Sequence, residues 1–129
     1  MNIDLFNVAS LILSGIRDKK ASDVNFTRVL RNILPWQQVA DMEFYGSNKR
    51  KLAYCHTSNC TKETIDDSDA VPVFWNRLQV KQGSLLLTSI LESDDEREFR
   101  VKVHLTDDSV LGYSIKILVV NSSQGNYYL

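Results

Sequence analysis

The sequence predicts an α+β fold, in which two or three helices in the N-terminal half pack on a curved antiparallel sheet. Residues 5–34 contain two segments whose apolar residues recur at helical spacing. Residues 98–120 contain two segments in which apolar and polar residues alternate, as in strands with one buried face. The chain has 129 residues, of which 43% are hydrophobic and 24% charged, and this is typical of one globular domain spanning residues 1–129.

The first segment predicts a helix because its apolar residues form one stripe: Leu5, Val8, Ala9, Ile12, Leu13 and Ile16. Asn2 or Asp4 can cap its start, and residues 18–20 break it. No positive charge precedes the apolar run, so a folded helix is favoured over a signal peptide. We also expect no membrane span, because no stretch approaches the roughly 18 apolar residues that one requires.

A second helix is predicted between a cap at Ser22 or Asp23 and Pro35. Its apolar face consists of Phe26, Val29, Leu30, Ile33 and Leu34. Each of the two helices is apolar on one side only, so each requires a surface to cover.

The middle of the chain predicts a hairpin, with strands at 40–45 and 52–56 around a turn at 46–48. A polar loop follows. Residues 70–78 fit either a strand or a short helix. The helix is favoured because it places Pro72 in its first turn and groups Val71, Phe74, Trp75 and Leu78 on one face.

The last third predicts three long strands at 84–92, 98–106 and 111–120. The apolar row of the second strand is Phe99, Val101, Val103 and Leu105, and that of the third is Leu111, Tyr113, Ile115, Ile117 and Val119. Short acidic connections join the three, so we expect an antiparallel meander.

This order of elements resembles the nuclear transport factor 2-like fold, an α+β cone in which a bent sheet wraps helices. The segments that carry the likeness are AVPVFWNRL, SLLLTSILES, EFRVKVHLTDD and GYSIKILVVNSSQGNYYL. The resemblance implies one of two roles. Some members are small isomerases or dehydratases, and others are non-catalytic homodimers or heterodimers that bind transport factors or peptide motifs.

The residues favour the non-catalytic role. A cone enzyme needs polar groups inside, whereas the inward rows are apolar except for Tyr113. Asp41 and Glu43 lie opposite the apolar row of their strand, and no nucleophile motif or phosphate loop is present. We therefore expect no catalysis, cofactor or metal. The alternative is a small isomerase or dehydratase that uses an acid and Tyr113.

The outer sheet face is the predicted partner-binding surface, formed by Arg100, Lys102, His104, Ser114, Lys116, Leu118 and Val120. Trp36 and Trp75 are either interface anchors or caps of the core. The expected role is that of a subunit that dimerises or heterodimerises, and the resemblance implies nuclear transport or mRNA export. A viral or host adaptor of similar architecture is a further alternative.

Direct nucleic-acid binding is not expected, because the net charge is −1 and the basic tip at 49–51 lacks interleaved aromatic residues. The acidic runs at 66–69 and 94–96 lack the glycine and distal glutamate of a calcium loop, so they are interpreted as solubilising loops.

The segment YCHTSNC holds both cysteines and one of the two histidines. Zinc requires four ligands, and the chain offers only Cys55, His56, Cys60 and His104. We interpret Cys55 as a small strand residue and Cys60 as a loop thiol, in an intracellular protein of the cytoplasm, the nucleus or both. The glycosylation tripeptides at Asn25, Asn59 and Asn121 therefore receive little weight.

Overall fold

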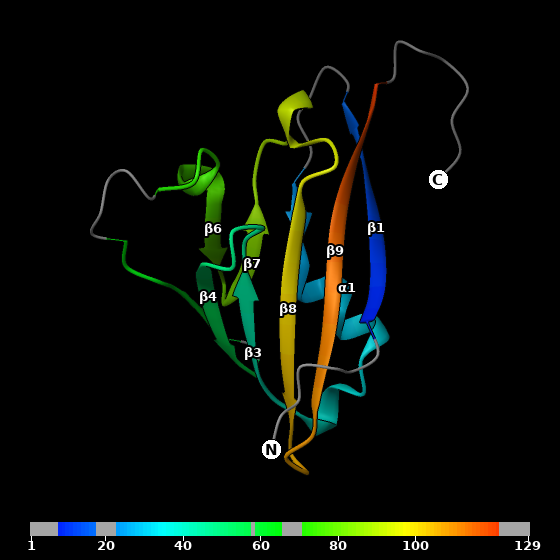
Figure 1. Ribbon diagram of the computed structural model, residues 1–129, viewed down its shortest axis with the longest axis vertical. Coiled ribbons are helices and arrows are strands. Elements are labelled where there is room, and N and C mark those ends of the chain that lie inside the picture. Colours follow the sequence, from blue (N-terminus) through cyan, green and yellow to red (C-terminus); the bar gives the residue numbers. More distant parts are fainter. Residues whose placement is uncertain (1–7, 18–22, 58, 66–70, 122–129) are drawn as a thin grey trace.

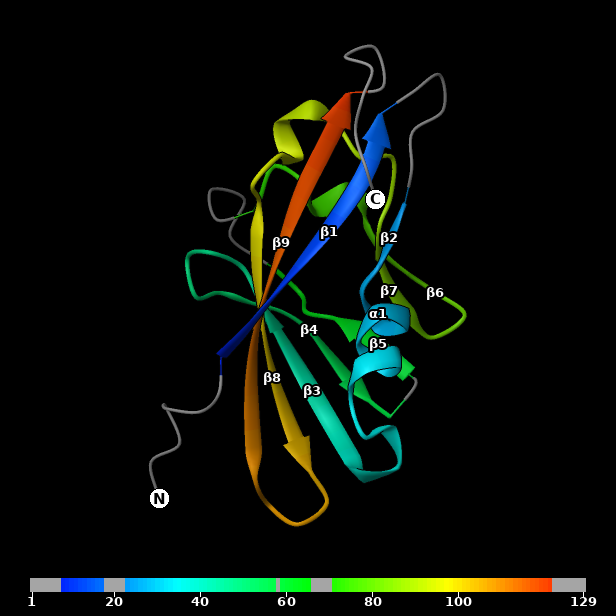
Figure 2. The same ribbon diagram turned by 90° about the vertical axis from the view of Figure 1, so that its right-hand side faces the viewer.

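The computed structural model describes residues 8–17, 23–57, 59–65 and 71–121, and these form two sheets that face each other (Figures 1 and 2). The larger sheet has six strands in the order β1-β9-β8-β3-β4-β5. Their bounds are β1 Val8–Arg17, β3 Val39–Tyr45, β4 Lys51–His56, β5 Asn59–Lys62, β8 Glu98–Leu105 and β9 Val110–Asn121. The smaller sheet has the order β2-β7-β6, with β2 Val24–Asn25, β6 Leu78–Lys81 and β7 Ser84–Leu87.

The expected α+β cone is wrong, because the protein is a mostly β sandwich of two sheets. Among the described residues, the only α-helix is α1, Phe26–Ile33, and the other helical segments are the 3-10 turns η1 Trp36–Gln38, η3 Trp75–Arg77 and η4 Glu92–Asp94. The second sheet covers the face that helices would cover in a cone. The likeness to the nuclear transport factor 2-like family therefore does not hold.

The largest error concerns the N-terminal segment, where a helix was expected and β1 is found. β1 pairs in parallel with β9 over ten residues, from Val8 opposite Gly112 to Arg17 opposite Asn121. An apolar run such as VASLILSGI fits both helical and strand periodicity. The partner β9 lies about a hundred residues away, so local spacing could not decide between the two.

The second predicted helix is confirmed as α1, with a later start than expected. Its cap is Asn25, whose side-chain oxygen accepts a hydrogen bond from the Arg28 N–H at 2.9 Å. Asp23 instead accepts a bond from the Ser89 N–H. α1 packs against β7 (Figure 2), in the layer of the smaller sheet.

Both predicted hairpins of the larger sheet are confirmed. β3 pairs with β4 and β8 pairs with β9, each antiparallel. The strand expected at 84–92 is found as β7, but it pairs with β6 and β2 rather than with β8. The connection through η4 is thus a crossing between the two sheets, and Ile90 and Asp94 are buried where the chain crosses.

The interior between the sheets is built around four phenylalanines. The ring of Phe26 on α1 lies 4.9 Å from that of Phe99 on β8 and 6.1 Å from that of Phe44 on β3, between centroids. Phe74 meets Phe99 edge-on at 5.3 Å. α1 therefore contributes its apolar face to the core between the sheets.

The ambiguous segment at 70–78 is neither of the two predicted elements. It holds only the 3-10 turn η3, after which β6 begins at Leu78. Trp36 and Trp75 are half-buried and pack against the core, so the expectation that they cap the core is confirmed. The segment NSSQGNYYL at 121–129, which carried part of the resemblance, lies outside the described residues except for Asn121.

Candidate interaction surface

The six-stranded sheet buries one face in the sandwich and presents the other outward. On β8, Phe99, Val101 and Val103 are buried, so the alternate side chains of the strand point away from the core. The residues predicted from sequence lie together on this outer face: Arg100, Lys102 and His104 on β8, and Ser114, Lys116 and Leu118 on β9. Val120 lies in β9, but its side chain is outside the described part of the structure.

The strand register extends this surface onto β3 and β4. Glu43 lies between Lys102 of β8 and Tyr54 of β4, and Asp41 lies between the two histidines, His104 and His56. We call the following set the outer face: Asp41, Glu43, Tyr45, Lys51, Tyr54, His56, Arg100, Lys102, His104, Ser114, Lys116 and Leu118. The sequence indicated that Asp41 and Glu43 lie opposite the apolar row of their own strand. It did not show that β3 adjoins β8, because the order of strands in a sheet depends on contacts between distant segments.

Glu43 is the electrostatic centre of the outer face. His104 Nε2 lies 3.1 Å from its Oε1, and Lys51 Nζ lies 3.3 Å from its Oε2. Burial raises the pKa of Glu43, but the hydrogen bonds from His104 and Lys51 outweigh it and hold the pKa below the usual value. Glu43 is thus an anion held by hydrogen bonds from His104 and Lys51, which explains its orientation.

Two tyrosines add apolar area to the same surface. Lys102 Nζ lies 5.9 Å from the ring centroid of Tyr45, and Lys51 Nζ lies 5.4 Å from that of Tyr54. Burial raises the pKa of Tyr45, and the neighbouring charge of Glu43 raises it further, so Tyr45 keeps its proton at neutral pH. The face therefore combines charges of both signs with aromatic rings, a composition typical of non-obligate protein interfaces.

Two open hollows mark the surface. One, of about 360 Å³, lies on the outer face and is lined by Ala40, Asp41, Glu43, Tyr54, His104, Leu105 and Asp108. The other, of about 680 Å³, lies beside α1 and is lined by Asn25, Arg28, Arg31, Lys81, Gln82, Ser84 and Leu86. The described residues contain no cluster of three or more side chains arranged to hold a metal ion.

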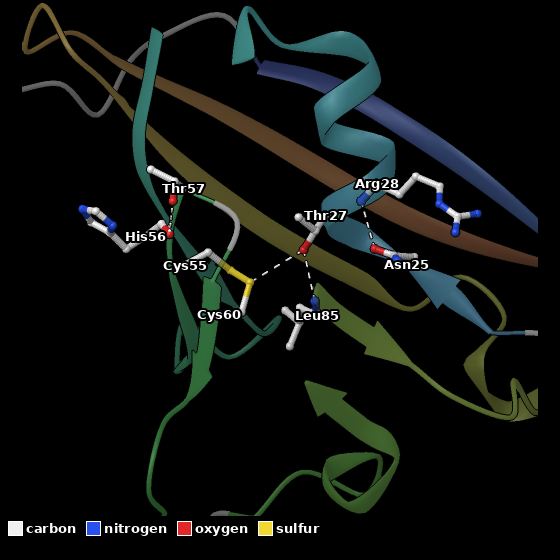
Figure 3. The surroundings of a disulfide bond; sticks show 8 residues. All are labelled: Asn25, Thr27, Arg28, Cys55, His56, Thr57, Cys60 and Leu85. Carbon is white, nitrogen blue, oxygen red and sulfur yellow. Dashed lines mark hydrogen bonds between the residues drawn. A yellow bond between two sulfur atoms is a disulfide. The ribbon is translucent and has the colours of Figure 1, made fainter. Parts of the chain in front are cut away.

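The two cysteines form a disulfide, which corrects the expectation of a strand residue and a free loop thiol. Cys55 on β4 and Cys60 on β5 are direct cross-strand partners with a Cα–Cα distance of 3.9 Å (Figure 3). The expectation failed because residues 59–62 were interpreted as loop, whereas they return as a strand beside β4. Thr27 lies against the bond: its Oγ1 is 3.6 Å from Cys60 Sγ and accepts a hydrogen bond from the Leu85 N–H.

The buried ion pair between Arg77 and Asp94 was also missed. Asp94 was interpreted as part of a solubilising acidic run, yet its side chain is fully buried and binds both Arg77 and Arg97. Three consecutive acidic residues give no local sign of which one turns inward. Which of the three is buried depends on how the chain crosses between the sheets.

Comparison with known proteins supports the sandwich. No family model matches the chain, and no curated protein matches its sequence. The first Ig-like domain of human CD48 antigen is similar in structure, with a TM-score of 0.55 and 12% identity over 100% of this chain and 95% of that one. Murine CEACAM1b gives a TM-score of 0.49 with 13% identity, over 85% of this chain and 50% of that one. The Ig1 domain of mouse SynCAM 2 gives 0.46 with 9% identity, over 90% and 96%.

The likeness to the CD48 domain shows that the chain has an Ig-like fold. The expected cytoplasmic or nuclear location is wrong, because the Cys55–Cys60 disulfide fits an extracellular protein. In the described residues, no helix is both long and apolar enough to cross a bilayer. The protein is a two-sheet sandwich of Ig-like fold with a helix, α1, packed beside the smaller sheet.

Proposed function

We propose that the chain is a non-catalytic recognition domain that binds a protein partner through the outer face. The observation that carries the proposal is the composition of that face. Ten of its twelve residues are charged, histidine or tyrosine side chains, and all twelve lie on one side of four adjacent strands. Among the described residues, no element covers this side of the sheet.

The arrangement of charge on the outer face supports binding in a fixed orientation. Arg100, Lys102 and Lys116 gather on β8 and β9, while Asp41 and Glu43 lie on β3. A partner with the opposite pattern would dock in one register only, because a shifted register brings like charges together. Tyrosine and arginine, which are enriched at interface hot spots, both occur here as Tyr45, Tyr54 and Arg100.

The Ig-like fold changes the biological setting expected from the sequence. Nuclear transport and mRNA export rested on the likeness to an α+β cone, and the two-sheet sandwich removes that basis. Protein binding itself does not depend on the cone. It rests on the residues of β8 and β9, which the structure brings together with those of β3 and β4.

Site-specific photo-crosslinking tests the proposal. A photoreactive amino acid replaces Lys102 on the outer face in one variant, and Lys81 on the smaller sheet in a matched control. Each is irradiated alone at high concentration, and then with a membrane preparation from the source organism. We expect a discrete cross-linked species from the Lys102 position and none from Lys81. Cross-links from Lys81 alone, or from neither position, would contradict the proposal.

A further inference from the structure

The disulfide gives new weight to the three asparagines that stand in N-glycosylation tripeptides. Such tripeptides carry no information in a cytosolic chain, because the transfer of an oligosaccharide to asparagine occurs in the secretory pathway. A chain with the Cys55–Cys60 bond fits that pathway. The remaining question is which asparagine the folded domain presents to solvent.

Asn59 meets the structural requirement. It begins β5, the edge strand of the larger sheet, and its tripeptide is Asn59-Cys60-Thr61. Asn59 and Thr61 are both exposed, whereas Cys60 between them is buried in the disulfide. Strand alternation thus points the two residues of the tripeptide outward together, while the middle residue anchors the strand to β4.

The neighbours of Asn59 leave room for a bulky group. Its register partner on β4 is His56, which is also exposed, and the partner of Thr61 is Tyr54. β5 is held by its backbone pairing with β4, by the Cys55–Cys60 bond, and by the Cys60 N–H, which donates to the Gly83 carbonyl at 2.8 Å. A sugar on Asn59 therefore displaces no contact that holds the strand.

The other two tripeptides lack this support. In Asn25-Phe26-Thr27, the Asn25 side chain caps α1, and Thr27 is buried with its hydroxyl engaged by the Leu85 N–H (Figure 3). The side chain of Asn121 lies outside the described part of the structure. Of the two tripeptides whose side chains the structure describes, only Asn59-Cys60-Thr61 presents both its asparagine and its threonine to solvent.

We propose that Asn59 carries an N-linked oligosaccharide. Its side-chain nitrogen forms a bond to the anomeric carbon of an oligosaccharide held on a lipid pyrophosphate. The bond from that carbon to the pyrophosphate oxygen breaks, the lipid pyrophosphate leaves, and the nitrogen gives one proton to the transferring enzyme. The nitrogen then joins the sugar as a secondary amide.

A glycan at Asn59 would also define one limit of the outer face. β5 and β9 lie at opposite ends of the strands β9-β8-β3-β4-β5. A sugar on β5 shields an edge strand from pairing with other chains. Its attachment point adjoins His56 and Tyr54 on the β4 side of the outer face, and it leaves β8 and β9 open. The glycan proposal does not depend on the proposed interface.

The test is site-resolved mass spectrometry of the chain secreted from a eukaryotic host. The protein is treated with peptide N-glycosidase in ¹⁸O water, which labels only those asparagines that carried a glycan. We expect the label on the peptide that contains Asn59. Both Asn59→Gln and Thr61→Ala should abolish it, whereas Thr61→Ser, which preserves the tripeptide, should retain it.

The parent protein is measured first, so a variant that fails to fold does not leave the proposal untested. An unlabelled Asn59 peptide from the secreted parent would overturn the proposal, even if Asn25 or Asn121 were labelled. Retention of the label in Thr61→Ala would overturn it as well, because the hydroxyl of the third residue is required. Neither outcome bears on whether the outer face binds a protein.

Discussion

Arg77 binds both carboxylate oxygens of Asp94, with Nη1–Oδ2 and Nη2–Oδ1 distances of 2.8 Å. Asp94 is fully buried and also receives the Leu91 N–H at 2.8 Å and Arg97 Nε at 3.0 Å. Both carboxylate oxygens of Asp94 therefore accept hydrogen bonds, and its negative charge is paired with arginine. The pair fixes the turn before β6 to the crossing before β8, so that it joins the smaller sheet to the larger one.

Replacing Asp94 should destabilise the fold strongly. Asp94→Ala leaves Arg77 partly buried without its partner, and breaking a buried ion pair costs about 3–5 kcal/mol of unfolding free energy. Glu92→Ala is the matched control, since Glu92 is an exposed acid in the same turn and should change the free energy by less than about 0.5 kcal/mol. Urea denaturation measures both. Equal free energies for the two variants would contradict the structural role of Asp94.

The same pair predicts how stability depends on pH. Burial raises the pKa of Asp94, but the hydrogen bonds from Arg77, Leu91 and Arg97 outweigh it, so the folded-state pKa lies below its ordinary value of 3.8. The unfolded chain then binds the proton more readily than the folded one. The contribution of Asp94 is complete above pH 3.8 and is lost as the pH falls through the lower folded-state value.

Denaturation midpoints between neutral and acidic pH check this dependence. The parent should lose stability more steeply below about pH 4 than Asp94→Asn, which has no carboxyl to titrate at this position. An identical slope in parent and variant would show that Asp94 does not contribute to acid unfolding.

The disulfide should add stability without being required for folding. It spans five positions, and closing so short a loop in the unfolded chain contributes about 2 kcal/mol. The larger core, built around Phe26 and Phe99, does not depend on it. We expect Cys55→Ala/Cys60→Ala to unfold cooperatively at a lower denaturant concentration. Loss of any cooperative transition would contradict this expectation, and so would free thiols detected in the native, unreduced parent.

The helix α1 should behave as part of the core. Phe26→Ala removes a fully buried ring and should cost about 3–5 kcal/mol, whereas Ile33→Ala on the exposed side of the same helix should cost less than about 1 kcal/mol. Thermal or urea denaturation of both variants measures the difference. If the two substitutions were equally mild, Phe26 of α1 would not be part of the core as described.

The sequence predicted those elements whose pattern is complete within a few residues. The alternation in β8 and β9 gave the correct strands, the correct hairpin and the correct outward residues, including Lys102 and His104. The spacing of Phe26 and Leu30 likewise gave α1. These patterns suffice because each of these elements has one solvent-exposed face and one buried face.

The remainder depended on contacts between distant segments. β1 is a strand because it pairs with β9, and β7 joins the second sheet because the chain crosses between layers at Asp94. Without those contacts, the apolar runs at 8–17 and 84–87 fit either a helix or a meander. The cysteine bond was missed for the same reason, because it required β5 to be recognised as a strand.

The central claim is that the outer face binds a protein, and charge reversal on that face tests it most directly. Lys102→Glu/His104→Glu alters two outward residues of β8, while Lys81→Glu alters an exposed lysine of the smaller sheet. The affinity of each variant for the partner found by crosslinking, or for a second copy of the chain, is measured by surface plasmon resonance. We expect the double variant to bind at least about tenfold more weakly, because like charges would face each other, and Lys81→Glu to bind as the parent does. Equal affinities for the double variant and the parent, with the fold intact, would contradict the claim.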